Sequence, residues 1–259
     1  MNCLNYNEGM TKNIIKKTAL ITGGAKRIGA HITEFLHSKG MNVLIHYRHS
    51  EAEAKKLKLK LNRKRKNSAE IFKADLLDSS SYDALIQACI NKFTRLDCLI
   101  NNASSYFPTP LAKINTRDWD DLLGSNLKAP LFLSKYAAPY LKKTSGSIVN
   151  ITDTHIKSPK KSYIIYSIAK AGLVTLTHSL AQELAPLVRV NAVAPGPILW
   201  PEDSKEFSKK YQDKVIKETL LKKTGAPQDI SEAVYFLISS ATYTTGHVLE
   251  VDGGRSFSL

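Results

Sequence analysis

The amino-acid sequence predicts one α/β domain: a doubly wound, parallel sheet of about seven strands with helices on both faces. The chain has 259 residues and is 43% hydrophobic, which is enough to bury one large core. Short runs rich in Val, Ile and Leu alternate with amphipathic segments of helical length, and this alternation is typical of βαβ units. The apolar runs carry few polar residues, as expected for strands that are buried on both faces of a parallel sheet.

Seven segments have the length and composition of strands. They are Thr18–Thr22, Asn42–Tyr47, Ala69–Lys73, a strand within Leu96–Asn101, Ser147–Ile151, Val188–Val193 and Val248–Val251. Helices are expected at Ile28–Ser38, where Gly40 ends the helix, in the basic segment after Tyr47, over about Asp118–Leu141 and over about Tyr163–Leu184. The stretch from Pro195 to about Lys205 is an irregular connection, and connections of this length are often functional.

Residues 1–17 precede the first strand and are predicted to form a short, frayed extension to the domain of residues 18–259. This extension is polar and has no apolar core of signal-peptide length, and Met10 is a second candidate start. No run approaches the roughly 20 apolar residues that a membrane span needs. The three cysteines, Cys3, Cys89 and Cys98, are far apart and odd in number, which argues against disulfides and a metal site. These features predict a soluble, cytoplasmic protein that binds no metal.

The formal net charge of +14 raises the question of an acidic partner. Many of the cations lie between Lys55 and Lys66, where Leu57 and Leu61 are one helical turn apart and Ala54 is on the same side. This pattern predicts a solvated helix with a thin apolar stripe. Nucleic-acid binding is the alternative, but no aromatic residues interleave with the lysines to stack on bases, and we expect no nucleic-acid partner.

A glycine-rich turn follows the first strand and reads Thr22-Gly23-Gly24-Ala25-Lys26-Arg27-Ile28-Gly29. Small residues between a strand and a helix let the backbone approach a pyrophosphate, whose charge is stabilised by the helix N-terminus. A tight turn without a ligand is the alternative, but the position after the first strand favours a Rossmann fold that binds a dinucleotide. The candidate cofactor-binding residues of this turn are Thr22, Gly23, Lys26, Arg27, Ile28 and Gly29.

The end of the second strand favours NADP(H) over NAD. Sites for NAD usually carry an acidic residue there, which holds the ribose 2′-hydroxyl, whereas this chain has no carboxylate before Glu51. Arg48 and Ser50 offer a cation and a hydroxyl to a 2′-phosphate instead, and Lys26 lies on the neighbouring turn. An ordinary turn at a strand end is the alternative, and the choice of donor stays open. The candidates are Tyr47, Arg48, His49 and Ser50.

Tyr166 and Lys170 are four positions apart at the start of a predicted helix. This spacing places both side chains on one face, one turn apart. Tyrosine has a pKa of ~10 in the free state, and a neighbouring ammonium is expected to lower it. A Tyr–Lys pair alone carries little information. Its position between the fifth strand and the segment Arg189–Gly196 makes it a candidate for catalysis.

These motifs resemble those of the short-chain dehydrogenase/reductase family, and the resemblance extends from Thr18 to Gly254. The turn Thr22–Gly29 is similar to T-G-x-x-x-G-x-G, the Tyr166–Lys170 pair matches Y-x-x-x-K, and Arg189–Gly196 matches R-V-N-x-[VI]-x-P-G. The resemblance implies that Lys170 also holds the nicotinamide ribose and that Asn126 holds a water that connects Lys170 to solvent. It implies further cofactor contacts after other strands, from Asp75, Leu76, Asn102, Ala103, Ser104, Pro195 and Gly196.

Several departures from the family pattern resemble pteridine reductases. Arg27 stands in place of the middle glycine of the turn, and Asp153 replaces a serine thirteen positions before Tyr166. Ser104 follows Asn-Asn-Ala where the family has glycine. A guanidinium suits phosphate and the polar edge of a heterocycle, and a carboxylate accepts hydrogen bonds from the amino groups of a pterin.

The segment Asn102–Leu111 is similar to N-A-S-S-F-Y-P-T-P-L of pteridine reductases, in which the first aromatic residue covers the pterin. Tyr106 is that residue by position, and Phe107 is the alternative because the aromatic pair is inverted here. The alternative interpretation is that both are core aromatic residues in a loop, without a substrate. By this resemblance the substrate-binding residues are Arg27, Ser104, Tyr106, Asp153 and Tyr166.

The resemblance implies NADPH-dependent reduction of pterins or dihydropterins, of the biopterin, dihydromonapterin or dihydrofolate type, by a homotetramer. Tyr166, assisted by Lys170 and Asn126, supplies the proton, and Asp153 orients the pterin and relays a second proton. A 3-oxoacyl-carrier-protein reductase or another carbonyl reductase is one alternative, against which Asp153 argues. A non-catalytic NADP-sensing or nucleic-acid-associated protein on the same fold is another, but such a protein would not need the set of Tyr166, Lys170 and Asn126.

Overall fold

The computed structural model describes residues 16–200 and 207–258. Within them, seven parallel strands form one sheet in the order β3-β2-β1-β4-β5-β6-β7, which confirms the predicted α/β class. The strands are β1 (Thr18–Ile21), β2 (Asn42–Tyr47), β3 (Ala69–Lys73), β4 (Cys98–Asn101), β5 (Ser147–Ile151), β6 (Arg189–Pro195) and β7 (Val248–Val251). The predicted N-terminal extension, with Met10, lies almost wholly outside the described residues.

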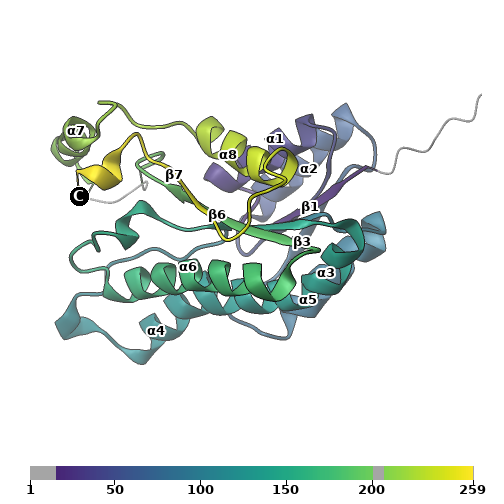
Figure 1. Cartoon of the computed structure of the whole chain (residues 1–259), viewed down its shortest axis with the longest axis horizontal. Coiled ribbons are helices and arrows are strands. Elements are labelled where there is room, and N and C mark those ends of the chain that lie inside the picture. Colours follow the sequence, from purple (N-terminus) through teal and green to yellow (C-terminus); the bar gives the residue numbers. More distant parts are fainter. Residues whose placement is uncertain (1–15, 201–206, 259) are drawn as a thin grey trace, which may run out of the picture.

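Helices cover both faces of the sheet (Figure 1). One face carries α1 (Arg27–Ser38), α2 (Glu51–Lys64) and α8 (Pro227–Ser239), and the other carries α3 (Ser81–Phe93), α5 (Ala129–Thr144) and α6 (Ile164–Leu184). Two shorter helices, α4 (Thr116–Leu123) and α7 (Lys209–Glu218), lie at the same end of the molecule in Figure 1. The sequence had predicted α1, α2 and α6 closely, whereas α3, α7 and α8 were not among the expected elements.

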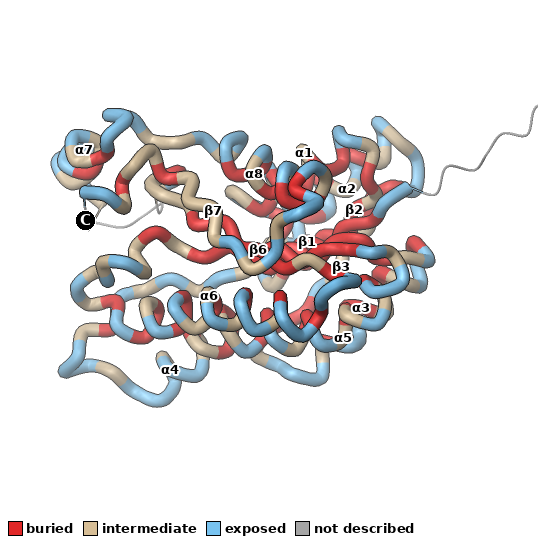
Figure 2. Tube along the Cα trace, in the orientation of Figure 1, coloured by how far each residue is buried: buried red, intermediate tan, exposed pale blue. Residues whose placement is uncertain are grey.

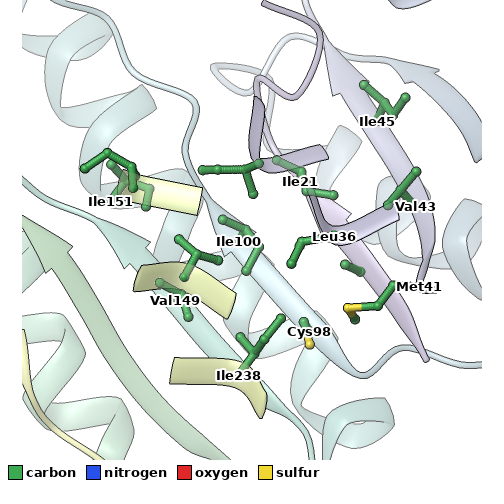
Figure 3. Packing of buried hydrophobic residues seen from close by; sticks show 14 of the residues in the cluster. Ile21, Leu36, Met41, Val43, Ile45, Cys98, Ile100, Val149, Ile151 and Ile238 are labelled. Carbon is green, nitrogen blue, oxygen red and sulfur yellow. The ribbon is translucent and has the colours of Figure 1, made fainter. Parts of the chain in front are cut away.

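The core consists of two apolar layers separated by the sheet, whose central strands β1, β4 and β5 are buried throughout (Figure 2). In β1, Leu20 packs toward α3, α5 and α6, while Ile21 packs toward α1, α2 and α8. Figure 3 shows Ile21 and Ile100 beside Leu36 of α1 in the second of these layers. Because successive side chains of a strand point to opposite faces, both layers need apolar residues, and the strands are therefore mostly apolar in sequence.

The basic helix α2 has the predicted thin apolar stripe. Ala54, Leu57 and Leu61 are its buried residues. Its lysines Lys55 and Lys60 form ion pairs with acidic side chains of α2 and α1. The interpretation as a solvated helix with one apolar stripe is confirmed.

The long helix predicted over about Asp118–Leu141 is interrupted. One π-helical turn, Gly124–Lys128, separates α4 from α5. Its flanking residues keep right-handed helical backbone angles, so the amphipathic pattern runs through the interruption and concealed it. Such π turns are frequent at functional sites. This one contains the candidate Asn126.

Helix α6 is the one helix among the described residues that is long and apolar enough to cross a membrane by length and composition, with a mean hydropathy of 1.3. It is not an uninterrupted apolar run, because it contains Lys170 and His178. Its residues Ala181 and Leu184 belong to the apolar layer against the sheet. The helix therefore has the packing of a core helix.

Candidate active site

The candidate site lies where the chain order of the sheet reverses. Strands β2 and β3 lie on one side of β1, and β5, β6 and β7 lie beyond its other neighbour, β4. Ligands of open α/β sheets bind at such a point, beyond the carboxyl ends of the strands. Two adjoining cavities of about 420 Å³ and about 230 Å³ are found there, and Gly23, Lys26, Ala103 and Ser104 line both. We call them the larger and the smaller cavity.

The glycine-rich turn between β1 and α1 is held by backbone groups of the segment that follows the neighbouring strand β4. The Thr22 hydroxyl oxygen accepts hydrogen bonds from the backbone N–H groups of Asn102 (2.9 Å) and Ala103 (3.0 Å). Gly29 packs against the turn so closely that a Cβ there would lie 2.1 Å from the carbonyl oxygen of Gly23. Only glycine fits at this position, and the resulting close backbone approach at a helix N-terminus is suited to a pyrophosphate.

Arg27 begins α1 with a left-handed backbone, φ 51°, a conformation that favours glycine. Its guanidinium Nη2 donates hydrogen bonds to the carbonyl oxygens of Leu199 (3.0 Å) and Trp200 (3.1 Å). These contacts join the cofactor turn to the segment that follows β6. Arg27 therefore adopts a backbone conformation that favours glycine and adds a cation to the wall of the larger cavity.

His46 of β2 braces the same turn and was not predicted. Its Nδ1 accepts the backbone N–H of Gly23 (3.1 Å), and its Nε2 faces the carbonyl oxygen of Ala74 (3.1 Å). Because the first partner only donates and the second only accepts, the imidazole is neutral with its hydrogen on Nε2. Burial lowers its pKa from 6.5 to about 4, although the Ala74 carbonyl and Asp75 oppose the shift. The sequence signal that could have identified His46 is a histidine inside an otherwise apolar strand.

The smaller cavity is lined by the residues predicted at the ends of β2 and β3: Tyr47, Arg48, His49, Ser50, Asp75 and Leu76. Arg48 and Asp75 form an ion pair (Nη2–Oδ2, 3.0 Å), so the carboxylate in this cavity is neutralised. The Nε atom of Arg48 is buried and has no hydrogen-bond partner among the residues that the structure describes. Lys26 also lines the cavity and pairs with Glu53 at 2.7 Å. This set of donors, together with the glycine turn, fits a dinucleotide cofactor.

The larger cavity contains a chain of hydrogen bonds centred on Asp153. The Tyr166 hydroxyl donates to Asp153 Oδ2 at 2.7 Å. The other carboxylate oxygen, Oδ1, accepts the backbone N–H of His155 (2.7 Å) and contacts its ring Nδ1 (2.9 Å). Burial alone raises the pKa of Asp153, but the hydrogen bonds and charge of His155, with the Tyr166 hydroxyl, bring it below its usual value. Asp153 is therefore a carboxylate at neutral pH.

The expectation that the pKa of Tyr166 lies below its ordinary value is wrong. Burial, followed by the charge and hydrogen bond of Asp153, raises the pKa of Tyr166 well above its ordinary value. The carboxylate is in direct contact with the hydroxyl, whereas the Lys170 ammonium donates to the carbonyl oxygen of Ile151 at 2.8 Å. Tyr166 therefore keeps its proton near neutrality and is suited to donate it.

Lys170 and Asn126 lie behind this chain of hydrogen bonds. Lys170 is 3% exposed, and burial lowers its pKa from 10.5 to about 8 against the opposing charge of Asp153. Asn126 is fully buried in the π turn, where its Oδ1 accepts a hydrogen bond from the Ser104 hydroxyl at 2.6 Å. Its amide group donates to the carbonyl oxygens of Ser105 and Leu122, both at 3.0 Å. The π turn thus connects the Ser104 loop to the site.

Aromatic rings form one wall of the larger cavity. Tyr106 lines it and contacts the Tyr166 ring edge-to-face, with centroids 4.8 Å apart, whereas Phe107 packs with the apolar cluster of Leu122 and Tyr163. The geometry therefore favours Tyr106 over Phe107 as the ring that meets a substrate. Further rings line the cavity from beyond β6, at Trp200, Phe207 and Tyr211.

The structure brings the predicted residues together. All of them line one or both cavities except Thr22 and Asn126, which are buried directly behind the walls. Sequence reasoning missed His46, His155, Lys160, Trp200, Phe207, Tyr211 and Arg255. His155 follows Asp153 by two positions, and Trp200 lies in the irregular stretch that the sequence had marked as functional. Part of that stretch, residues 201–206, lies outside the described residues.

Comparisons with known proteins agree on the broad class of the chain. Residues 23–256 match the family model described as Enoyl-(Acyl carrier protein) reductase. Pteridine reductase 1 of Leishmania tarentolae is 37% identical, over 96% of this chain and 99% of that protein. The 3-oxoacyl-[acyl-carrier-protein] reductase FabG of Staphylococcus aureus is 32% identical, over 92% of this chain and 97% of that protein. Glucose 1-dehydrogenase 2 of Bacillus subtilis is 29% identical, over 95% of this chain and 97% of that protein.

Proposed function

This chain belongs to the short-chain dehydrogenase/reductase family of oxidoreductases, and we propose that within it the protein is an NADPH-dependent reductase of pterins or dihydropterins. One observation carries the proposal: the proton donor candidate Tyr166 is hydrogen-bonded to a carboxylate, Asp153, at 2.7 Å. The similarity to pteridine reductase 1 of Leishmania tarentolae supports the same conclusion.

A carboxylate at position 153 suits a pterin better than a ketone. The pterin ring presents amino and ring N–H groups, which a carboxylate can accept. The oxygen of a ketone gathers negative charge during hydride transfer, and a carboxylate in the same cavity repels that charge. The hydrogen bonds of His155 keep Asp153 ionised, so this preference holds near neutral pH.

The shape of the larger cavity supports a flat substrate. Tyr106 is 39% exposed and offers its ring to the cavity, with Trp200 and Phe207 further along the wall. Offset stacking of aromatic rings contributes about 0.5–1.5 kcal/mol beyond the burial of area. A bicyclic heteroaromatic substrate gains this stacking, whereas an extended acyl chain does not.

When bound, NADPH supplies the hydride for a ring carbon of the substrate. Tyr166 donates its hydroxyl proton to the neighbouring ring nitrogen, so that one C=N bond becomes a CH–NH group. Lys170, buried one helical turn away, stabilises the phenolate that remains. Asp153 holds the substrate's N–H groups and relays the proton for a second reduction, and Asn126 connects Lys170 to water.

The proposed cofactor is NADP(H) rather than NAD(H). Arg48 and Lys26 are cations of the smaller cavity, and Ser50 adds a hydroxyl. Asp75, its one carboxylate among the described residues, already pairs with Arg48 and does not compete for a ribose hydroxyl. A 2′-phosphate would find charge-assisted donors here. We further propose that residues 18–259 work as one catalytic domain, as a cytoplasmic homotetramer.

A carbonyl reductase, such as a 3-oxoacyl-carrier-protein reductase, is the second candidate. The similarity to FabG of Staphylococcus aureus favours it, and the net charge of +14 would suit an acidic carrier protein. The carboxylate at position 153 argues against it for the electrostatic reason given above.

The deciding experiment follows NADPH oxidation by the full-length protein with biopterin, dihydrobiopterin, dihydromonapterin, dihydrofolate and an acetoacetyl thioester. We expect turnover with at least one pterin and a kcat/KM for the thioester that is at least tenfold lower. Efficient reduction of the thioester without reduction of any pterin would replace the proposal with the second candidate. No turnover with any of them, despite NADPH binding, would favour a non-catalytic role.

A further inference from the structure

The Asp153 carboxylate is shared between two partners, Tyr166 and His155, and only Tyr166 takes part in the proton transfer described above. Oδ2 accepts the hydroxyl of Tyr166 at 2.7 Å, and Oδ1 is bound by both the backbone N–H and the ring Nδ1 of His155. His155 lies in a 3-10 turn, Thr154–Ile156, that begins directly after Asp153. The three side chains therefore form one row in the larger cavity, tyrosine–carboxylate–imidazole.

We propose that His155 is a positioning residue for proton transfer: it fixes the Asp153 carboxylate toward Tyr166, and its own protonation state sets how readily Tyr166 releases its proton. The inference rests on the proposed role of Tyr166 as proton donor. It adds a residue and a pH response that neither the motifs nor the comparisons contain.

The first half of the proposal follows from geometry. A carboxylate can only accept hydrogen bonds, so Nδ1 of His155 carries a hydrogen in both protonation states of the ring. Two donors on Oδ1 restrict rotation of the carboxylate and leave Oδ2 directed at Tyr166. The backbone donor is present whatever residue occupies position 155, whereas the ring donor depends on the histidine.

The second half of the proposal, the effect of the protonation state of His155 on Tyr166, follows from charge. The His155 side chain is 34% exposed and lines the cavity, so its Nε2 can exchange protons with solvent. A positive imidazolium 2.9 Å from Oδ1 offsets the negative charge that holds the Tyr166 proton. Tyr166 is then the stronger acid. When the imidazolium loses its proton, the carboxylate holds the hydroxyl more firmly and proton release becomes harder.

Other charged groups face this row. Lys170 and Lys160 line the same cavity. Arg255 lies in the C-terminal 3-10 turn (Arg255–Phe257) that packs against the turn of His155, and its guanidinium pairs with Glu218 at 2.8 Å. Lys157, two positions after His155, pairs with Glu250 at 2.5 Å. Lys170 is coupled to Asp153 by charge. Among the described residues, His155 and Tyr166 are the titratable side chains whose polar atoms contact the carboxylate oxygens of Asp153.

The test compares two variants with the wild-type protein. His155→Asn keeps a donor near the position of Nδ1 but carries no charge at any pH, and His155→Leu removes the donor. His178→Asn is the matched control, because His178 is exposed on α6, the helix of Tyr166. The readouts are kcat against pH, KM for NADPH, and the NMR titration of the His155 ring in the ligand-free protein.

In the wild type we expect kcat to be on the order of three- to tenfold lower at about pH 8 than at about pH 5. His155→Asn should show a flat profile near the wild-type value at high pH. His155→Leu should lose a further ten- to a hundredfold in kcat, typical of a lost hydrogen bond to a charged group, at an unchanged KM for NADPH. The control should keep the wild-type profile.

The NMR titration tests the same coupling without any substrate. Asp153→Asn should shift the titration of the His155 ring to lower pH, because the neighbouring anion is gone. An unshifted titration, or a wild-type pH profile in His155→Asn, would overturn the inference. If the wild type reduces the thioester but no pterin, the proposed function fails, and the same kinetic comparison on the thioester still tests His155. The two failures are thus distinguishable.

Discussion

The guanidinium of Arg27 donates a hydrogen bond to the carbonyl oxygen of Leu199 at 3.0 Å, although 172 positions separate the two residues in the sequence. The contact joins the cofactor turn to the segment that walls the larger cavity. A single side chain thereby couples the two halves of the site, and it does so from a left-handed position where glycine is the easier residue.

Arg27→Gly should separate the effect of the left-handed backbone at this position from the contribution of the guanidinium. Glycine adopts φ near 51° without the roughly 1–2 kcal/mol that a side chain costs there, so the fold should be retained and Tm should change by only a few degrees. Loss of the guanidinium should raise the KM for the pterin about tenfold or more. Thermal unfolding and steady-state kinetics measure the two effects. A KM equal to that of the wild type would show that Arg27 does not contribute to the substrate site.

Tyr166→Phe should lower kcat by ~10²–10⁴-fold, the usual contribution of general acid catalysis. The variant keeps the ring that contacts Tyr106 and removes only the hydroxyl that donates to Asp153. NADPH binding, measured by titration calorimetry, should be nearly unchanged. Wild-type turnover in this variant would mean that the proton comes from another group.

Asp153→Ser should convert the site toward carbonyl reduction. It removes a charged hydrogen-bond partner of the pterin, worth ~1.5–3 kcal/mol, so kcat/KM for dihydrobiopterin should fall roughly ten- to a hundredfold. It also removes the anion that repels a developing alkoxide, so activity on the acetoacetyl thioester should rise. The ratio of the two kcat/KM values in variant and wild type measures the change. An unaltered ratio would argue against a role for Asp153 in substrate choice.

The wild type should bind NADPH more tightly than NADH, and Arg48→Ala should reduce the difference roughly ten- to a hundredfold. The physical reason is the loss of a charge-assisted donor in the smaller cavity. Arg63→Ala is the matched control, because Arg63 is an exposed cation on α2 outside both cavities. Equal affinities of the wild type for the two cofactors would contradict the assignment.

His46 should make the fold sensitive to acid. Its pKa is about 4 in the folded chain and 6.5 as the ordinary value, so the fold favours the neutral ring. Below pH 6.5 the unfolded chain binds a proton that the folded chain does not, and the free energy of unfolding decreases as pH falls toward 4. The full effect is on the order of 3 kcal/mol. Urea unfolding between pH 4.5 and pH 7.5, with His46→Gln as comparison, checks the slope attributable to this residue.

Local sequence patterns predicted much of the fold and of the candidate site. The apolar runs of β1, β4 and β5 must be buried on both faces, and a parallel sheet is the arrangement that does this. The glycine turn and the Tyr166–Lys170 spacing are short-range features that a strand–turn–helix or one helical turn already defines. The π turn was missed because the residues on either side of it keep right-handed helical backbone angles, so the helical pattern of the sequence continues through it.

The sequence alone determined which residues stand at the ends of the strands, because the order of strands and helices places those ends at one edge of the sheet. Only the tertiary structure decided what these residues do to one another. His46 accepts a hydrogen bond from Gly23, and Arg48 forms an ion pair with Asp75. The Tyr166 hydroxyl donates to Asp153, whereas the Lys170 ammonium donates to the carbonyl oxygen of Ile151. Such contacts join residues that are distant in the chain. A pKa depends on burial and on the nearest charge in space, so even the direction of the shift at Tyr166 could not be obtained from its spacing to Lys170.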